Sequence, residues 1–557
     1  MKHRFSKNKQ LRFGTSGLRD QVIHMTDLEC YINACGFIAF LMERGEVKTG
    51  GNIAVGGDRR KSTPRIMAAV GRAIEDSGCN VVCCGLIPSP TLAYYAMEQQ
   101  IPSIMVTGSH IPEDRNGIKF TKSSGEVLKS DETDILRNVA LIREKMYNQS
   151  EEKSLFDSFC RFRVTPASLQ PVCEDEAVDL YIKRYLDVFG RDALEGIKLV
   201  FYQHSAVGRD IILSIFEKLG AQIIPINRSD EFIPVDTEKI NRETRTFLKE
   251  TARKYKPFAI ISTDGDSDRP LLTDEDGNFL PGDKLGALAS LYLRPARVAL
   301  PVSSNDGVIS MLHDNRVIVR LTRIGSPYVI QAMTELLGEI PGGRVAGWEV
   351  NGGFLLGSPW NINGRPLKAL PTRDAVLPLL AVLLLARRED LSLSELIEQR
   401  LPVRYTHADI IDNTAPGCES YNTELGRMIV KIFTPSDNNI IQSEFSKNSL
   451  TIHCQDGTVR EATPEESIEL NGIRDRIREY FNSGNGFKEI VALNFIDGIK
   501  ISFSNGEISH LRPSGNAPEF RNYATGDTAE RAVEIVEEGK IILPRIIAYV
   551  QNQDHTY

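Results

Sequence analysis

The sequence predicts an α/β protein in which three similar mixed α/β domains precede a smaller C-terminal α+β domain. A strand–turn–helix–strand pattern occurs three times between residues 52 and 325, each time opening on an apolar run. Residues 406–557 show short alternating strands with hairpin turns instead. The length of 557 residues suits three or four domains of roughly 150 residues each.

The first pattern covers residues 52–85, NIAVGGDRRKSTPRIMAAVGRAIEDSGCNVVCCG. Ser62 is placed to cap a helix, and Pro64 fits its first turn. One apolar face precedes the break at Gly78, formed by Ile66, Ala69, Val70, Ala73 and Ile74. These features predict a βαβ unit with a helix between two parallel strands.

The same pattern returns at residues 198–226 and 297–325, and the C-terminal part differs from both. Its hairpin signals are Asp497-Gly498 and Asn505-Gly506, and a helix is expected from near Thr528. Residues 406–470 are polar and show only weak periodicity. We expect four domains, at 1–168, 169–293, 294–405 and 406–557.

Composition argues for small-molecule partners in the cytoplasm. The net charge of -8 gives no broad positive field for nucleic acid or an anionic membrane. No apolar signal region follows the basic MKHRFSKNKQ segment, and no apolar run is long enough to span a bilayer. Cys83 and Cys84 lie in an apolar strand, so we expect buried free thiols that face opposite ways.

Three carboxylates follow the apolar strand FAIIST: Asp264, Asp266 and Asp268. A calcium loop of the EF-hand type needs glycine at the sixth position, which Arg269 occupies here, and a helix before the loop. Mg2+ suits the cluster better because it prefers hard oxygen ligands and a phosphate oxygen. An acidic surface turn is the alternative that the residues alone leave open.

A lone serine, Ser109, follows the strand PSIMVT, at the edge where ligands of open α/β sheets collect. Gly108 removes a side chain there, so we expect an accessible hydroxyl. In an extended segment His110 would point away from Ser109, which disfavours hydrolase chemistry. Lys119 returns towards the serine after the Asn116-Gly117 turn, for proton transfer or phosphate neutralisation.

Five segments in one order resemble the α-D-phosphohexomutase superfamily, and within it the bacterial phosphomannomutase/phosphoglucomutase group. They are FGTSGLRD (13–20), VTGSHIPEDRNGIKF (106–120), DGDSDRP (264–270), GWEVNGGF (347–354) and RPSGNAPEFRNY (512–523). The resemblance implies a heart-shaped architecture of four domains, with three similar mixed α/β domains and a C-terminal α+β cap.

The resemblance also implies the roles of the site residues. Ser109 would carry a phosphoryl group, and Mg2+ would be held by that phosphoserine with Asp264, Asp266 and Asp268. The implied catalytic set is Ser109, His110, Arg19, Arg269 and Lys119, with Lys119 as acid and base. Substrate would bind at Thr322, Arg323, Glu349, Asn351, Arg373, Arg512, Ser514, Gly515, Asn516 and Arg521.

The implied reaction converts mannose 1-phosphate and mannose 6-phosphate into each other through a hexose 1,6-bisphosphate, which also activates the enzyme. Departures from the family pattern at Gly108, Ile111, Asn351, Asn516 and Ala517 leave glucose phosphates, or both sugars, as alternatives. A protein of another class, an inactive sugar-phosphate-binding regulator, is the third. We expect a monomer or homodimer that binds hexose phosphates and neither nucleic acid nor membrane.

Overall fold

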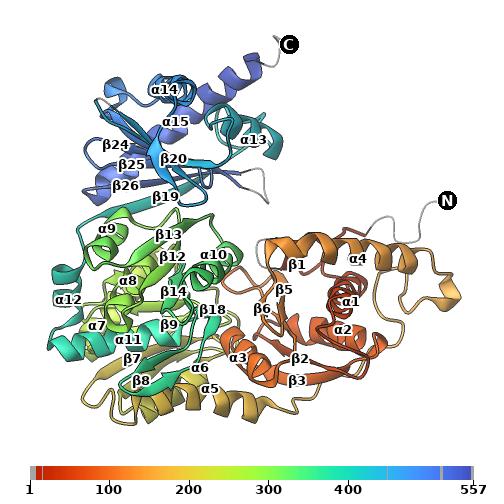
Figure 1. Cartoon of the computed structure of the whole chain (residues 1–557). Helices are drawn as coiled ribbons and strands as arrows, with labels where there is room; N and C mark the ends of the chain where they lie inside the picture. The colour runs from red at the N-terminus through yellow and green to blue at the C-terminus, as the bar shows by residue number, and fades with distance from the viewer. Residues whose placement is uncertain (1–7, 15–16, 448, 515–518, 554–557) are drawn as a thin grey trace. The chain divides into compact units, whose positions relative to one another are not determined.

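The computed structural model describes residues 8–14, 17–447, 449–514 and 519–553 (Figure 1). The chain divides into two compact units. The first unit holds the chain up to Pro301, Leu312–Arg320 and Gly325–Leu401. The second unit holds Val302–Met311, Leu321–Ile324 and the chain from Pro402 onward.

The first sheet has the order β1-β5-β4-β2-β3, with β6 paired to β5. Its strands are β1 (Leu18–Gln21), β2 (Asn52–Gly57), β3 (Asn80–Leu86), β4 (Ser103–Val106), β5 (Arg115–Lys122) and β6 (Gly125–Glu126). Its helices are α1 (Asp27–Glu43), α2 (Thr63–Asp76), α3 (Ser89–Gln99) and α4 (Lys129–Tyr147). Strand β2 runs parallel to β3 and β4, whereas β5 is antiparallel to β4 and β1.

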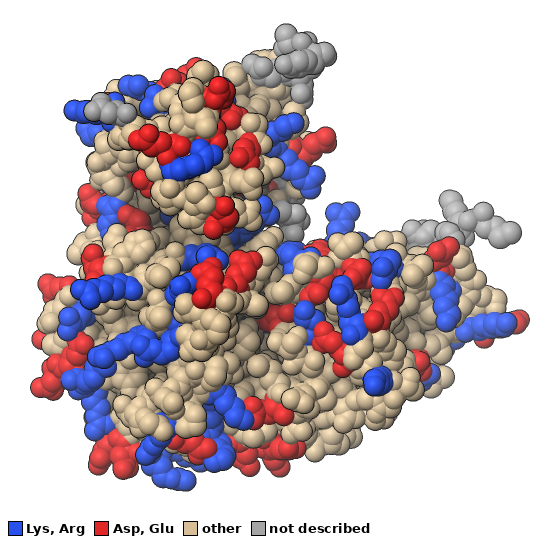
Figure 2. Space-filling view, viewed as in Figure 1, with Lys and Arg blue, Asp and Glu red and all other residues tan. Residues whose placement is uncertain are grey.

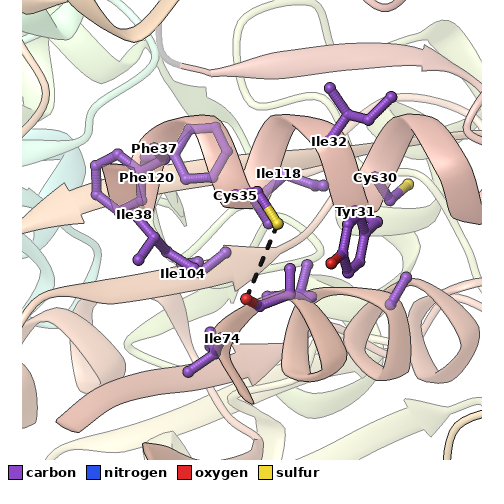
Figure 3. Close-up of a cluster of buried hydrophobic side chains, with 14 of the residues drawn as sticks. Cys30, Tyr31, Ile32, Cys35, Phe37, Ile38, Ile74, Ile104, Ile118 and Phe120 are labelled. Carbon is purple, nitrogen blue, oxygen red and sulfur yellow. Dashed lines mark hydrogen bonds between the residues drawn. The ribbon is translucent and has the colours of Figure 1, made fainter. Parts of the chain in front are cut away.

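The core of this domain holds the two strands that flank the serine loop. Figure 3 shows Ile104 of β4 and Ile118 and Phe120 of β5 in one cluster with side chains of α1. The rings of Phe37 and Phe120 stack with centroids 4.6 Å apart. Burying side chains of this size contributes about 1.5–3 kcal/mol each, so the ends of β4 and β5 are firmly placed.

The second and third sheets repeat the pattern, with orders β11-β10-β9-β7-β8 and β13-β12-β14-β15-β18. The second domain contains α5 (Glu174–Phe189), β7 (Lys198–His204), α6 (Arg209–Lys218), β8 (Gln222–Arg228), α7 (Arg242–Tyr255), β9 (Ala259–Thr263), β10 (Pro270–Thr273) and β11 (Phe279–Leu280). In both of the first two domains a central strand pairs in parallel with two neighbours, and an antiparallel strand follows.

The third sheet and its helices follow α8 (Gly282–Leu293). They are β12 (Arg297–Pro301), α9 (Asp306–Asp314), β13 (Ile318–Thr322), α10 (Ser326–Glu339), β14 (Val345–Trp348), β15 (Phe354–Leu356), β18 (Leu370–Asp374), α11 (Val376–Glu389) and α12 (Leu393–Arg400). A separate hairpin consists of β16 (Trp360–Ile362) and β17 (Arg365–Leu367). The prediction of three similar mixed α/β domains is therefore confirmed.

The C-terminal sheet has the order β19-β26-β25-β24-β23-β20-β21-β22. Its elements are β19 (Tyr405–Asp412), α13 (Thr423–Ile432), β20 (Ile440–Phe445), β21 (Leu450–Cys454), β22 (Val459–Glu461), α14 (Pro464–Arg478), β23 (Ile490–Asn494), β24 (Ile499–Phe503), β25 (Ile508–Pro513), β26 (Glu519–Gly526) and α15 (Ala529–Gln553). The turns at Asp497-Gly498 and Asn505-Gly506 join antiparallel strands as predicted.

Two smaller predictions from the sequence have different outcomes in the structure. Cys83 and Cys84 are buried and pack into different clusters, as predicted from alternation in β3. Ser62 is the N-cap residue of α2, as predicted, but its side chain makes no cap hydrogen bond, because its backbone is helical and its Oγ accepts from Asn116 Nδ2. Within the described residues no helix is long and apolar enough to cross a membrane. Figure 2 shows basic and acidic side chains interspersed on the face drawn.

Candidate active site

Ser109 lies in the loop between β4 and β5, and it contacts the loop that follows β9. Ser109 Oγ donates a hydrogen bond to Asp264 Oδ2 at 2.6 Å. Ser109 is fully buried, with a left-handed φ of 57°. The accessible hydroxyl expected from sequence is therefore wrong in this conformation, because the serine points into the aspartate loop.

The same backbone conformation corrects the expectation for His110. The left-handed Ser109 bends the segment, so the two side chains do not point to opposite sides. His110 Nδ1 lies 3.4 Å from Ser109 Oγ. Burial and the guanidinium groups of Arg269 and Arg19 lower the pKa of His110 to about 2, so its ring is neutral at pH 7.

The aspartate loop gathers three buried carboxylates whose oxygens lie within 4.8 Å of one another. Asp264 Oδ1 accepts from the backbone N–H groups of Asp268 and Arg269, which fixes the loop. Burial, with the charges of Asp266 and Asp268, raises the pKa of Asp264 well above its usual value. Asp266 Oδ1 and Asp268 Oδ1 have no hydrogen-bond partner within the described part of the chain. Such oxygens suit a metal ion, so the triad fits one.

Lys119 reaches this triad from β5. Its Nζ donates to Asp266 Oδ2 at 2.6 Å and to Asp268 Oδ2 at 2.7 Å. Burial by itself would lower the pKa of Lys119, but the two carboxylates outweigh it and raise the pKa. Lys119 and Asp268 also line a pocket with Ser89, Glu126 and Thr372, so the lysine borders open space.

Arginines surround the triad. Arg373 of β18 donates from Nε to Asp268 Oδ2 at 3.0 Å and from Nη1 to Glu349 Oε2 at 2.9 Å. Arg269 Nε lies 3.8 Å from Asp268 Oδ1. Burial, together with Arg269 and Arg373, lowers the pKa of Arg19 to about 10, while Asp266 and Asp268 act in the opposite direction. The first unit thus brings Ser109, His110, Lys119, the triad and these arginines together.

Glu349 and Asn351 lie in the connection between β14 and β15. Gly352 N donates to Glu349 O at 2.9 Å, and Gly352 has a φ of 86°, so the segment is a turn. Asn351 Oδ1 accepts from Gly353 N, and Glu349 is paired with Arg373. Both side chains are buried and point to protein partners in this conformation.

The other predicted substrate residues lie in the second unit. Thr322 Oγ1 donates to Arg323 O, and Arg323 Nε donates to Ile496 O. Arg512 of β25 and Arg521 of β26 are direct cross-strand partners. Arg512 Nε lies 2.8 Å from Asp497 Oδ2, and Ser514 N donates to Glu519 O across the loop. Gly515 and Asn516 lie outside the described residues.

Sequence reasoning missed three residues at this edge: Asp58, Arg60 and Ser89. Ser89 Oγ donates to Asp266 Oδ2 at 2.5 Å, and Asp58 and Arg60 brace the serine loop. The available signal was their place just after β2 and β3, because the parallel strands β2, β3 and β4 end at the same sheet edge.

Three domains of one topology, with a serine and an aspartate triad at adjoining sheet edges, define a multidomain class of α/β enzymes. Family models for phosphoglucomutase/phosphomannomutase α/β/α domains I, II and III match residues 10–146, 179–277 and 281–403. The domain limits near residues 168, 293 and 406 stay predictions. The chain belongs to the phosphoglucomutase/phosphomannomutase family.

Relatives agree over almost the whole length. A phosphomannomutase of Salmonella muenchen is 37% identical over 529 residues, covering 95% of this chain and 94% of the relative. A phosphomannomutase of Sinorhizobium fredii is 36% identical, covering 96% and 98%. A phosphoglucomutase/phosphomannomutase family protein of Burkholderia thailandensis has a TM-score of 0.65 at 16% identity, covering 96% and 97%. That structure supports the fold.

Proposed function

We propose that this protein is a phosphomannomutase that carries a phosphoryl group on Ser109 and exchanges it with mannose 1-phosphate or mannose 6-phosphate. The observation that carries the proposal is the 2.6 Å hydrogen bond from Ser109 Oγ to Asp264, within a buried aspartate triad. A hydrolase needs a base for its serine, whereas a phosphate carrier needs a cation site beside it. The two phosphomannomutase relatives support mannose as the sugar.

Mg2+ is the metal that fits the triad best. Asp264, Asp266 and Asp268 offer only hard oxygen atoms, and a phosphate oxygen on Ser109 would complete the set. When bound, Mg2+ neutralises charge on the phosphoryl group during transfer. Without a cation, a phosphate on Ser109 would face the carboxylate of Asp264 in a buried setting, which is costly.

The surrounding cations have distinct tasks in this proposal. Arg19, Arg269 and Arg373 stay charged and stabilise the phosphoryl group as it moves. Lys119 acts as acid and base, because its Nζ lies beside the triad and borders the open pocket, where it can give a proton to a departing oxygen or take one from an attacking hydroxyl. His110 is neutral, so it contributes no charge; its Nδ1 lies within hydrogen-bonding reach of Ser109 Oγ.

The distal phosphate of the sugar binds in the second unit. Arg512 and Arg521 stand directly opposite each other on neighbouring strands, where two like charges are unfavourable. Asp497 offsets part of this charge at Arg512, and a bound phosphate would offset more of it. Ser514, Gly515 and Asn516 add hydroxyl and backbone donors. Thr322, Arg323, Glu349 and Asn351 are assigned to the sugar, whose 1,6-bisphosphate is the intermediate and activator.

Phosphorylation of Ser109 is tested by intact-protein mass after incubation with Mg2+ and a hexose 1,6-bisphosphate. We expect an increase of one phosphate in wild type and in Ser123→Ala, and none in Ser109→Ala. An inactive binding protein or a hydrolase would show no adduct that depends on Ser109.

Sugar preference is tested by kcat/KM for mannose 1-phosphate and glucose 1-phosphate, with the matching bisphosphate and Mg2+. The two sugars differ only at carbon 2, so the assay and not the motif decides between them. A strong preference for glucose would overturn the proposal in favour of phosphoglucomutase, and equal values would indicate dual specificity. Light scattering during the same assay separates the monomer from the homodimer. A cytoplasmic location stays a prediction.

A further inference from the structure

Arg60, which follows β2, is bound to the backbone of the serine loop along its length. Its guanidinium is buried and donates hydrogen bonds of 2.6–3.1 Å to four carbonyl oxygens, those of Ser109, Ile111, Pro112 and Arg115. One rigid, planar group therefore fixes both ends of the loop at once, which a flexible ammonium could not do.

Asp58 holds the same loop from the other side. It pairs with Arg60 Nε at 3.1 Å, and its Oδ2 also accepts from Thr107 Oγ1 at 2.8 Å and Gly108 N at 3.2 Å. Thr107 Oγ1 in turn accepts from Ser109 N at 2.8 Å. The side chains of Asp58 and Arg60 are both fully buried, so this ion pair is a fixed support rather than a surface contact.

The ring of Phe232, in the second domain, packs against the Arg60 guanidinium. The Arg60 guanidinium carbon lies 3.9 Å from the centre of the Phe232 ring. A side-chain carbon at Gly108 would lie 2.6 Å from the same guanidinium. The planar group is therefore held between Gly108 and Phe232, a close cation–π contact that the missing side chain at residue 108 permits.

The ring also touches the aspartate loop. A side-chain carbon at Gly265 would lie 2.6 Å from Ser109 O and 3.0 Å from the Phe232 ring. Phe232 is fixed in turn by the next residue, because Ile233 N donates to Ser205 Oγ at 2.7 Å. Gly108, Arg60, Phe232 and Gly265 thus form one continuous stack from the serine loop to the aspartate loop.

We propose that Arg60 and Phe232 are positioning residues that hold Ser109 in its left-handed conformation opposite Asp264. A non-glycine residue at a φ of 57° persists only where its surroundings determine it, and this stack supplies them. For the reaction, the inference rests on the proposed phosphoryl transfer through Ser109. The expected defect is in the transfer step and not in binding the sugar phosphate, because neither residue is assigned to the sugar.

The first test compares Phe232→Leu with Phe232→Tyr and with Phe247→Leu, which removes another aromatic ring of the second domain, one that packs on Tyr202. We expect Phe232→Leu to slow single-turnover phosphorylation of Ser109 about 100-fold. The steady-state KM for the sugar phosphate should change little. Phe232→Tyr keeps the ring face and should retain the rate, as should Phe247→Leu. A Phe232→Leu rate equal to wild type, or a loss matched by Phe247→Leu, would overturn the proposal.

The second test reads the loop itself and does not depend on activity. Amide hydrogen exchange across residues 107–115 should quicken in Phe232→Leu and Arg60→Lys, and stay unchanged in Phe247→Leu. If wild type accepts no phosphate but the exchange pattern appears, the proposed function fails and the positioning role stands. Unchanged exchange in both variants refutes the positioning role, whatever the enzyme does.

Discussion

The serine–aspartate region of the first unit and the arginine pair of the second unit handle charge in opposite ways. In the first, Arg373 and Asp268 expose only 4% and 3% of their side chains and satisfy each other. In the second, Arg521 exposes 38% of its side chain and lies 3.9 Å from Glu519, while Arg512 exposes 16% and pairs with Asp497 at 2.8 Å. The reacting groups are held by buried partners, whereas the arginines of the proposed phosphate clamp are partly exposed to solvent.

This difference follows from solvation. A buried charge without a partner costs several kcal/mol, so every cation near Ser109 must be matched by a carboxylate. A half-exposed arginine is still hydrated and can exchange water for phosphate at little cost. Changes in the first region should therefore remove chemistry or stability, and changes in the second should mainly weaken binding.

The largest effect is expected from Asp266→Asn, which removes one charge from the triad. Metal-dependent mutase activity should fall by about 10⁴-fold, since charge neutralisation of the phosphoryl group is most of the catalysis. Mg2+ titration by calorimetry should show weakened binding. Asp276→Asn, at an exposed aspartate in the turn after β10, is the control; equal activity in the two variants would contradict the metal site.

Arg373→Met should destabilise the first unit by about 3–5 kcal/mol, because Asp268 and Glu349 would lose a buried partner. The midpoint of urea denaturation measures the effect. The exposed Arg365→Met is the matched control and should leave the midpoint almost unchanged. A decrease in the denaturation midpoint as small as that of the control would mean that the ion pairs of Arg373 do not stabilise the first unit.

Arg512→Ala should raise KM for the sugar phosphate about 10- to 100-fold with a smaller change in kcat, since a charged hydrogen bond contributes about 1.5–3 kcal/mol. Steady-state kinetics separate the two constants. Arg478→Ala, on α14, removes the same charge away from the arginine pair and should not change KM. An unaltered KM in Arg512→Ala would refute the clamp.

Lys500 is the exception in the second unit, a buried lysine whose Nζ donates to Val302 O. Burial lowers its pKa to about 8, against a small opposing effect of Asp306. The charged form therefore costs stability below pH 8, and the cost fades as pH rises from 8 to the unfolded value of 10.5. Lys500→Met should stabilise the second unit by about 2 kcal/mol at pH 7, after the lost hydrogen bond is subtracted.

Thermal unfolding followed across pH 7–11 checks this prediction. The stabilising effect of Lys500→Met should shrink steadily above pH 8, while the exposed Lys488→Met should change little at any pH. A gain that does not vary with pH would come from packing rather than from the charge.

Local patterns predicted elements well and side-chain directions poorly. Apolar periodicity predicted the helix found at Thr63–Asp76, and the Asp-Gly and Asn-Gly pairs predicted the turns at Gly498 and Gly506, because those signals act within a few residues. The direction expected for His110 was wrong because it assumed extended backbone, whereas Ser109 has a left-handed φ of 57° and its hydroxyl bonds to Asp264 of a distant segment.

The sequence by itself determined the elements, the three-fold repeat of the α/β domain and the inventory of one serine, three aspartates and several cations. Only the tertiary structure decided which of them meet and in which ionisation state. Arg60 joined the site because the ends of β2 and β4 coincide, and the His110 ring is neutral because burial and the neighbouring arginines lower its pKa. The spacing of residues along the chain predicts helices and strands through its periodicity. Burial and charge instead depend on contacts in space, which join residues more than a hundred positions apart.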